Sequence, residues 1–312
     1  FDGFFGSRPG ADFVIALGML NGGASYGASA RLNDGAEEIY SILGVWTMDE
    51  NGQPKFDKWI LSTIAHEFCH SYTNPLVDKH KTELESAGEK IFPLVAEEMK
   101  RQAYGGWLTM MYESLVRACC VRYALAINGP EAAAQEVKYN RDRRFLWTGE
   151  LADLLAEYEK QRDSYKSLDA FFPKIAAFFD GYSRRVAQEV AFLVEEKRKQ
   201  MEALKEKSPK IVAMIPANGA QDVDPGLKAV VVTFDRPMKA GNMAVMSFDQ
   251  NKFPKMPGKA AYDANRTVLT IPVALEPGKE YQLGLNGEGF LVMQDDQGNP
   301  LVPVVIRFKT RM

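Results

Sequence analysis

The chain has 312 residues, of which 46% are hydrophobic and 25% are charged, a composition typical of a globular protein large enough for two domains. The formal net charge is −3, so the charge balance gives no reason to expect nucleic acid or an anionic membrane as a partner. The best apolar run, "DFVIALGML" at 12–20, has the length of a strand, so the sequence predicts no transmembrane segment.

The front of the chain reads as a small sheet. Residues 12–20 and 37–46 are predicted strands, and the glycine-rich "NGGASYG" at 21–27 separates them. A hairpin turn explains these glycines, and so does an edge strand that an extended peptide can approach. The chain begins with Phe1 rather than Met, which indicates a processed or trimmed N-terminus and a signal peptide absent from this sequence.

A helix is predicted next, over residues 55–74. Apolar positions including Trp59, Ile60, Ile64 and Phe68 recur at helical spacing, and Asn74-Pro75 is a stop signal. We therefore expect the helix to end there, with Asn74 as its cap.

This predicted helix carries "HEFCH", with His66 and His70 on either side of Glu67. Residues four apart lie on one face of a helix, so the two imidazoles can reach one ion, and neutral imidazole is a preferred ligand of Zn²⁺. Glu67 is offset by one residue, so we expect it to act as the general base toward water. The pattern is the HExxH signature of zinc peptidases.

The third ligand must come from another segment. Leu76 stands where a metzincin would have its third histidine, which excludes that subclass. Glu113 is a lone carboxylate in an otherwise apolar predicted helix, with Arg117 four residues later. Glu113 is either a zinc ligand that Arg117 orients, with Arg117 also able to bind substrate oxygen, or half of an ion pair on a helix rim. His80 is the alternative third ligand.

Several further residues are open to two interpretations. Tyr104, Tyr112 and Tyr123 could supply an oxyanion-stabilising hydroxyl or could be core residues. Three cysteines, with no CxxC pair, indicate neither a disulfide framework nor a thiolate zinc site, and Cys69 is expected to serve packing.

The remaining segments define two domains. Helical patterns cover 86–106, 107–129, 150–165, 168–182 and 184–207, which makes residues 1–207 an α+β domain. The period then changes to two, with predicted strands at 228–235, 266–273, 279–285 and 302–310 between turn signals. This rhythm predicts an all-β sandwich over residues 208–312.

Two resemblances add to this interpretation. The HExxH pattern, followed on a later helix by a candidate ligand glutamate, resembles the gluzincin group of zinc metallopeptidases. More narrowly, "HEFCHSYTNPLVDKH" with "YESLVRA" resembles an uncharacterised bacterial HEFxHxxxNP family of expected, usually exported metallopeptidases; this likeness covers about residues 10–200. It implies a zincin-like fold for the first domain.

The second domain resembles bacterial Ig-like domains of surface-layer and secreted proteins. The likeness rests on the stretch 211–238, namely on Pro216, Asn218, Gly219, Asp222, Val223, Thr233, Phe234, Pro237 and Met238. It implies a spacer or binding arm that contacts protein or polysaccharide at a cell surface, and an extracytoplasmic location.

The sequence therefore predicts a zinc-dependent peptidase that hydrolyses peptide or protein substrates. His66, His70 and Glu113 would hold Zn²⁺, Glu67 would activate water, and Arg117 would assist. One alternative is a catalytically inactive zincin-like binding or cell-surface interaction module. In the other, "HEFCH" is coincidental in a structural protein.

Overall fold

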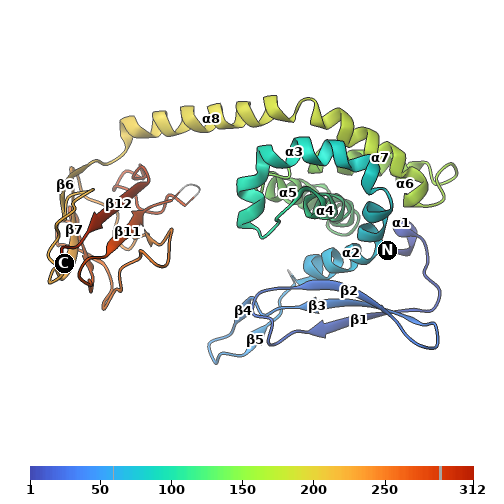
Figure 1. Cartoon of the computed structure of the whole chain (residues 1–312), viewed down its shortest axis with the longest axis horizontal. Coiled ribbons are helices and arrows are strands. Elements are labelled where there is room, and N and C mark those ends of the chain that lie inside the picture. Colours follow the sequence, from blue (N-terminus) through green and yellow to red (C-terminus); the bar gives the residue numbers. More distant parts are fainter. Residues whose placement is uncertain (59, 288–289) are drawn as a thin grey trace. The chain divides into compact units, whose positions relative to one another are not determined.

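The structure is a computed structural model that describes residues 1–58, 60–287 and 290–312 (Figure 1). It divides into two compact units, Phe1–Ala191 and Phe192–Met312. The division falls within helix α8 (Val186–Lys207), whereas the change in sequence period lies at its end. Trp59, which the apolar pattern assigned to a helix, lies outside the described residues. Within the described ranges, none of the helices combines the length and apolarity needed to cross a membrane.

Unit 1 contains a three-stranded sheet in the order β1-β3-β2 (Figure 1). Strand β1 (Ala11–Leu17) runs parallel to β3 (Glu37–Leu43), and β2 (Tyr26–Arg31) pairs antiparallel to β3. β2 is an edge strand that starts within the expected glycine-rich connection. The small residues of "YGASAR" gave no alternating apolar signal, so sequence reasoning missed this strand. A short hairpin, β4 (Thr47–Met48) with β5 (Pro54–Lys55), precedes the first long helix.

Helix α2 (Ile60–Lys79) packs on this sheet. Phe68 and Tyr72 contact the fully buried Ile39 of β3. The backbones of α2 and β2 approach each other closely at Gly27. A Cβ added at Gly27 would lie 2.1 Å from the backbone oxygen of Glu67 and 3.0 Å from the Cβ of His70. Only glycine permits this contact between strand and helix.

α2 continues through Pro75, so the expected stop at Asn74-Pro75 is wrong. Proline lacks the N–H that would bond to the carbonyl four residues earlier, which here belongs to Ser71. The Arg8 guanidinium donates to that carbonyl instead, at 3.0 Å from Nη2. Arg8 also pairs with Glu37 at 3.3 Å and lies 4.0 Å from the ring centre of Tyr72. The helix therefore keeps its path because a side chain replaces the missing donor.

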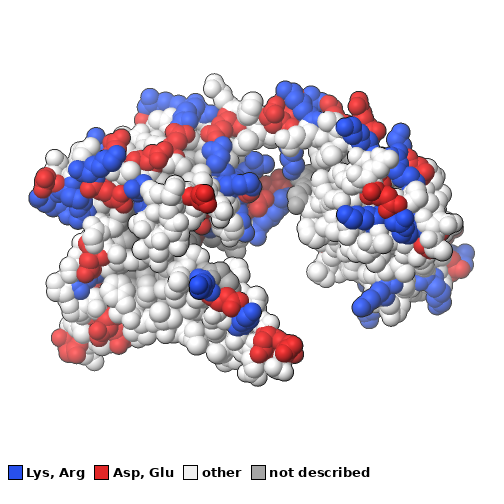
Figure 2. Space-filling view, turned by 180° about the vertical axis from the view of Figure 1, so that it is seen from behind, with Lys and Arg blue, Asp and Glu red and all other residues white. Residues whose placement is uncertain are grey.

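The remaining helices of unit 1 form a layered bundle beside α2 (Figure 1). Trp147, Phe171, Phe179 and Tyr182 are fully buried or nearly so in its core. Over these helices, Figure 2 shows acidic and basic side chains intermixed on one face of the molecule. The helices are α1 (Asp2–Phe5), α3 (Lys81–Arg101), α4 (Trp107–Asn128), α5 (Pro130–Asp142), α6 (Thr148–Lys160) and α7 (Leu168–Ser183).

Unit 2 contains two antiparallel sheets around one apolar core, with strand orders β6-β7-β10-β9 and β12-β11-β8. Alternate residues of the central strands point inward, as Val230 and Val232 do in β7 and Leu283 and Leu285 do in β11. The strands are β6 (Ile211–Ile215), β7 (Ala229–Phe234), β8 (Val245–Met246), β9 (Ala261–Tyr262), β10 (Val268–Pro272), β11 (Glu280–Leu285) and β12 (Val304–Lys309).

The turn at the start of unit 2 is tied to β12 by Asn218. Its side chain donates to the carbonyl of Val305 at 3.1 Å and accepts from the N–H of Arg307 at 2.8 Å. Gly219 follows with φ +86°, a conformation that favours glycine. The Asn-Gly pair that carried the resemblance in sequence therefore closes this end of the domain.

Candidate metal centre

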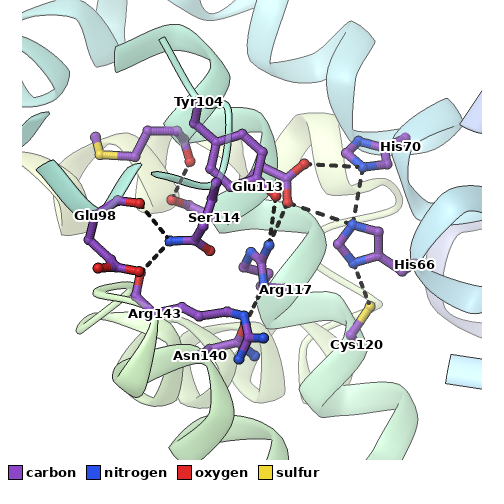
Figure 3. Close-up of polar contacts among 12 residues, drawn as sticks. His66, His70, Glu98, Tyr104, Glu113, Ser114, Arg117, Cys120, Asn140 and Arg143 are labelled. Carbon is purple, nitrogen blue, oxygen red and sulfur yellow. Dashed lines mark hydrogen bonds and ion pairs between the residues drawn. The ribbon is translucent and has the colours of Figure 1, made fainter. Parts of the chain in front are cut away.

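Three donor groups from α2 and α4 converge on one point (Figure 3). The Nε2 atoms of His66 and His70 lie 3.3 Å apart. Glu113 places Oε2 3.6 Å from Nε2 of His66 and Oε1 3.5 Å from Nε2 of His70. The two histidines, which lie four residues apart on one helix, and the carboxylate of Glu113, 43 residues beyond His70, therefore lie close together, as the sequence suggested.

The spacing of these atoms fits a tetrahedral Zn²⁺ site. Two ligands at 2.0–2.2 Å from zinc and at the tetrahedral angle lie roughly 3.3–3.6 Å apart. In addition, two imidazole nitrogens and a carboxylate facing one point repel each other unless a cation or a proton lies between them. The residues present therefore suit a divalent cation with affinity for nitrogen and oxygen.

A buried polar network holds Glu113 from behind (Figure 3). Nη2 of Arg117 lies 3.0 Å from Oε2 of Glu113, yet this buried oxygen accepts no well-aligned hydrogen bond. The guanidinium also donates to Asn140 at 2.7 Å and to the Tyr104 hydroxyl at 2.9 Å. The arrangement holds the carboxylate in place. Oε2 has no well-aligned hydrogen-bond donor among the described residues and faces His66, so it can accept a proton or bind a cation there.

The charges around Glu113 keep it ionised. Burial alone would raise its pKa, but His66, Arg117 and His70 together lower it below the ordinary value. Burial and then the negative charge of Glu113 raise the pKa of the Tyr104 phenol to about 12, although Arg117 opposes the shift, so this hydroxyl stays protonated. Glu113 and Arg117 are thus an ion pair, as one interpretation proposed, but a buried one that also faces the histidines.

Glu67 lies beside this cluster with only 7% of its surface exposed. Burial, followed by the negative charge of Glu113, raises its pKa to about 7, although the backbone N–H of Gly27 opposes the shift. A carboxylate with a pKa near neutrality can both accept and return a proton, which is what a general base requires.

His80 lies apart from the cluster and has its own partners. Its Nδ1 is 2.9 Å from Glu83 and its Nε2 is 2.8 Å from Asp169, and the ring stacks on Phe172 with centroids 4.2 Å apart. Both ring nitrogens are engaged, so the structure does not bring His80 to the donor group. Tyr112 bonds to Asp78 and Tyr123 packs against Phe1, whereas Tyr104 adjoins Glu113.

Sequence reasoning missed two residues that contact the histidines. Oδ1 of Asn74 lies 3.1 Å from Nδ1 of His70, and Sγ of Cys120 lies 3.8 Å from Nδ1 of His66. Asn74 is therefore no helix cap. The signal was its spacing of four residues from His70, which the interpretation of Pro75 as a stop obscured.

The three cysteines gather where α2 meets α4 and all are buried. Contact with Cys119 raises the pKa of Cys69, and contact with Cys69 together with burial raises that of Cys120. Cys69 and Cys120 are therefore thiols rather than thiolates, and Cys69 serves packing.

The two units match two family profiles. Residues 205–310 match the bacterial Ig-like domain, so the second unit is of this class, as its turn residues suggested. Residues 2–178, more than half of the chain, match a family described as Domain of unknown function (DUF4932). The chain therefore belongs to the DUF4932 family and continues into a bacterial Ig-like domain. A search of curated proteins gives no match.

Two of the solved structures that are similar come from surface-layer proteins. One is "surface layer protein SbsC, domains 1-6", at 13% identity and a TM-score of 0.23, covering 80% of this chain and 33% of that chain. The other is the S-layer protein rSbsC(31-844), at 16% identity and a TM-score of 0.24. This match covers 86% of this chain and 35% of that chain. The chain thus spans about a third of either relative, and TM-scores this low carry no conclusion on fold or function.

Proposed function

We propose that unit 1 is a zinc-dependent peptidase. The observation that carries this proposal is the convergence of His66, His70 and Glu113 at tetrahedral ligand spacing, with Glu67 buried beside them. Three protein ligands leave a fourth position open, which is typical of catalytic rather than structural zinc sites.

The side chains divide the work of hydrolysis. Zn²⁺ would polarise the scissile carbonyl and make water a better nucleophile at neutral pH. Glu67 would accept a proton from the attacking water and return it to the leaving amine, a role that its place beside the ligand histidines on α2 supports. Arg117 holds Glu113 in its ionised form and acts as a positioning residue, because its Nη atoms already contact Glu113, Tyr104 and Asn140.

A peptide substrate suits the surroundings of the site. β2 lies at the edge of the sheet, and its Gly27 touches the helix at Glu67 and His70. An edge strand can bind an extended peptide through backbone hydrogen bonds, which brings the chain past these residues. This supports the proposal that the substrate is a peptide or protein in extended conformation.

The test compares the wild-type protein with Glu67→Gln. Zinc content is measured on protein purified without an affinity tag, and cleavage is measured with casein and a peptide library. We expect about one zinc per chain in both proteins and a loss of roughly 100-fold or more of the activity in the variant. Equal cleavage by both proteins would contradict the proposal, and so would less than about a tenth of an equivalent of zinc.

The same assay addresses the binding-module alternative. Stoichiometric zinc with no cleavage by the wild type would favour a zincin-like protein that binds without hydrolysis. We further propose an extracytoplasmic location, with the Ig-like unit contacting protein or polysaccharide at a cell surface; the match of residues 205–310 supports this. Fractionation of the producing bacterium would test it, and recovery in the cytoplasm would contradict it.

A further inference from the structure

We propose that Asn74 is a positioning residue that fixes the tautomer and orientation of His70, and that Arg8 keeps Asn74 in place by bracing α2 across Pro75. Both residues lie outside the ligand set. The inference rests on the proposed function only in that zinc binding is one of its readouts.

The contact between Asn74 and His70 determines where the imidazole proton lies. Oδ1 of Asn74 is an acceptor 3.1 Å from Nδ1 of His70, so Nδ1 carries the proton and donates it. Nε2 is then left with a free lone pair, and this is the atom that lies 3.5 Å from Glu113 and 3.3 Å from Nε2 of His66. A hydrogen bond of this kind is the usual means of orienting a metal-binding histidine.

This contact requires that α2 remain helical beyond Asn74. His66, His70 and Asn74 follow one another at intervals of four, which forms a column on one face of the helix. Pro75 would ordinarily disturb this column, because it leaves the carbonyl of Ser71 without its helical donor. Arg8 supplies that donor at 3.0 Å, while Glu37 and Tyr72 hold the guanidinium.

The first test removes the acceptor. In metal-free protein at about pH 8, where an ordinary imidazole is neutral, long-range ¹H–¹⁵N spectra show which nitrogen of His70 is protonated. We expect protonation on Nδ1 in the wild type and a shift toward Nε2 in Asn74→Leu. Zinc affinity, measured by competition with a chromophoric chelator, should fall about 10- to 100-fold in Asn74→Leu. Asn74→Asp, which retains an acceptor, should restore both readouts.

The outcomes separate this inference from the proposed function. A wild-type His70 protonated on Nε2 would overturn the inference, and so would an Asn74→Leu variant with unchanged tautomer and affinity. If no zinc binds but the tautomer shifts as expected, Asn74 is a positioning residue and the zinc peptidase proposal fails. Asn128→Ala, at the exposed end of α4, is the control and should change neither readout. Thermal melting confirms that each variant is folded.

The second test isolates the brace with a double-mutant cycle. Arg8→Met removes the donor to Ser71, and Pro75→Ala restores a backbone N–H that can replace it. We expect Arg8→Met to weaken zinc binding in the wild type and to do so less in the Pro75→Ala background, by at least about twofold. The contacts of Arg8 with Glu37 and Tyr72 are lost in both backgrounds and cancel. Equal effects in the two backgrounds would contradict the brace.

Discussion

Arg117 is the arginine that pairs with Glu113 in the protein interior and, with the two histidines, keeps this carboxylate ionised. The two side chains are each 9% exposed and lie on consecutive turns of α4, with Nη2 3.0 Å from Oε2. Phe145 lies against the guanidinium, whose carbon is 4.4 Å from the ring centre. Taking charges out of water is costly, so the pair is stable only as long as both members are present.

We therefore predict that Arg117→Met lowers the free energy of unfolding of metal-free protein by about 3–5 kcal/mol, because it leaves a buried carboxylate unpaired. Urea denaturation measures the change. Arg101→Met is the matched control, since Arg101 pairs with Glu97 and Glu98 on an exposed helix face and should contribute less than about 1 kcal/mol. Equal effects of the two substitutions would show that the buried pair has no special role.

The site residues differ in how far the sequence reveals them. His66, Glu67 and His70 are predictable because one helix fixes their relative positions. Glu113 could be suggested, since a carboxylate in an apolar helix needs a partner, but its meeting with His66 depends on how α2 packs on α4. The only sequence signal for the contact of Asn74 was its spacing of four residues from His70, and the apparent stop at Pro75 obscured it because the continuation of α2 depends on tertiary contacts.

At the scale of elements, the contact between β2 and α2 sets the depth at which the HExxH helix lies. We predict that Gly27→Ala lowers the free energy of unfolding by about 1–3 kcal/mol, because its Cβ would collide with the backbone of Glu67. Gly23→Ala, where an added Cβ meets nothing within 4 Å, should change it by less than about 0.5 kcal/mol. A smaller effect at Gly27 than at Gly23 would contradict the close approach.

His80 lies between α2 and α3 and contacts Asp169 and Phe172 of α7. The stability that these contacts give should depend on pH. Burial would lower the pKa of His80, but Glu83 and Asp169 outweigh it and the net pKa is raised above 6.5. A raised pKa means that the stabilisation is complete below about pH 6.5 and is lost as the pH rises through the folded-state pKa.

We therefore predict that His80→Gln reduces the free energy of unfolding more at pH 6 than at pH 9. The difference should be about 1 kcal/mol or less, because the acidic partners are partly exposed. Denaturant titrations at the two pH values, each compared with the wild type, measure it. An identical effect at both would show that the charge of His80 contributes nothing.

The elements with strong periodicity were predictable from sequence, and the short or small-residue elements were not. Helices α3, α4, α6, α7 and α8 overlap their expected ranges, as do β7, β10, β11 and β12, whereas no helix was predicted for α5. β8 and β9 have two residues each, too few to show a period. α2 exceeded its predicted length because tertiary contacts overrode a local stop signal.

At the scale of the whole molecule, the two units have separate cores and should unfold separately. We predict two calorimetric transitions, of which zinc raises only one. At about 100 times the dissociation constant, zinc should add about 2.7 kcal/mol to the stability of unit 1. His70→Asn should abolish the zinc-dependent shift of the unit 1 transition. Asn218→Ala should lower only the melting temperature of unit 2. A zinc-dependent shift of both transitions would contradict this independence.

The buried cysteines give the protein a chemical reporter of its own. Cys69 lies on one helix of the candidate site, and Cys119 and Cys120 lie on the other, each with at most 7% of its surface exposed. An alkylating reagent can therefore reach these sulfurs only when α2 and α4 separate. The rate of alkylation measures how often the two halves of the site come apart, and a cation shared between the helices would slow it.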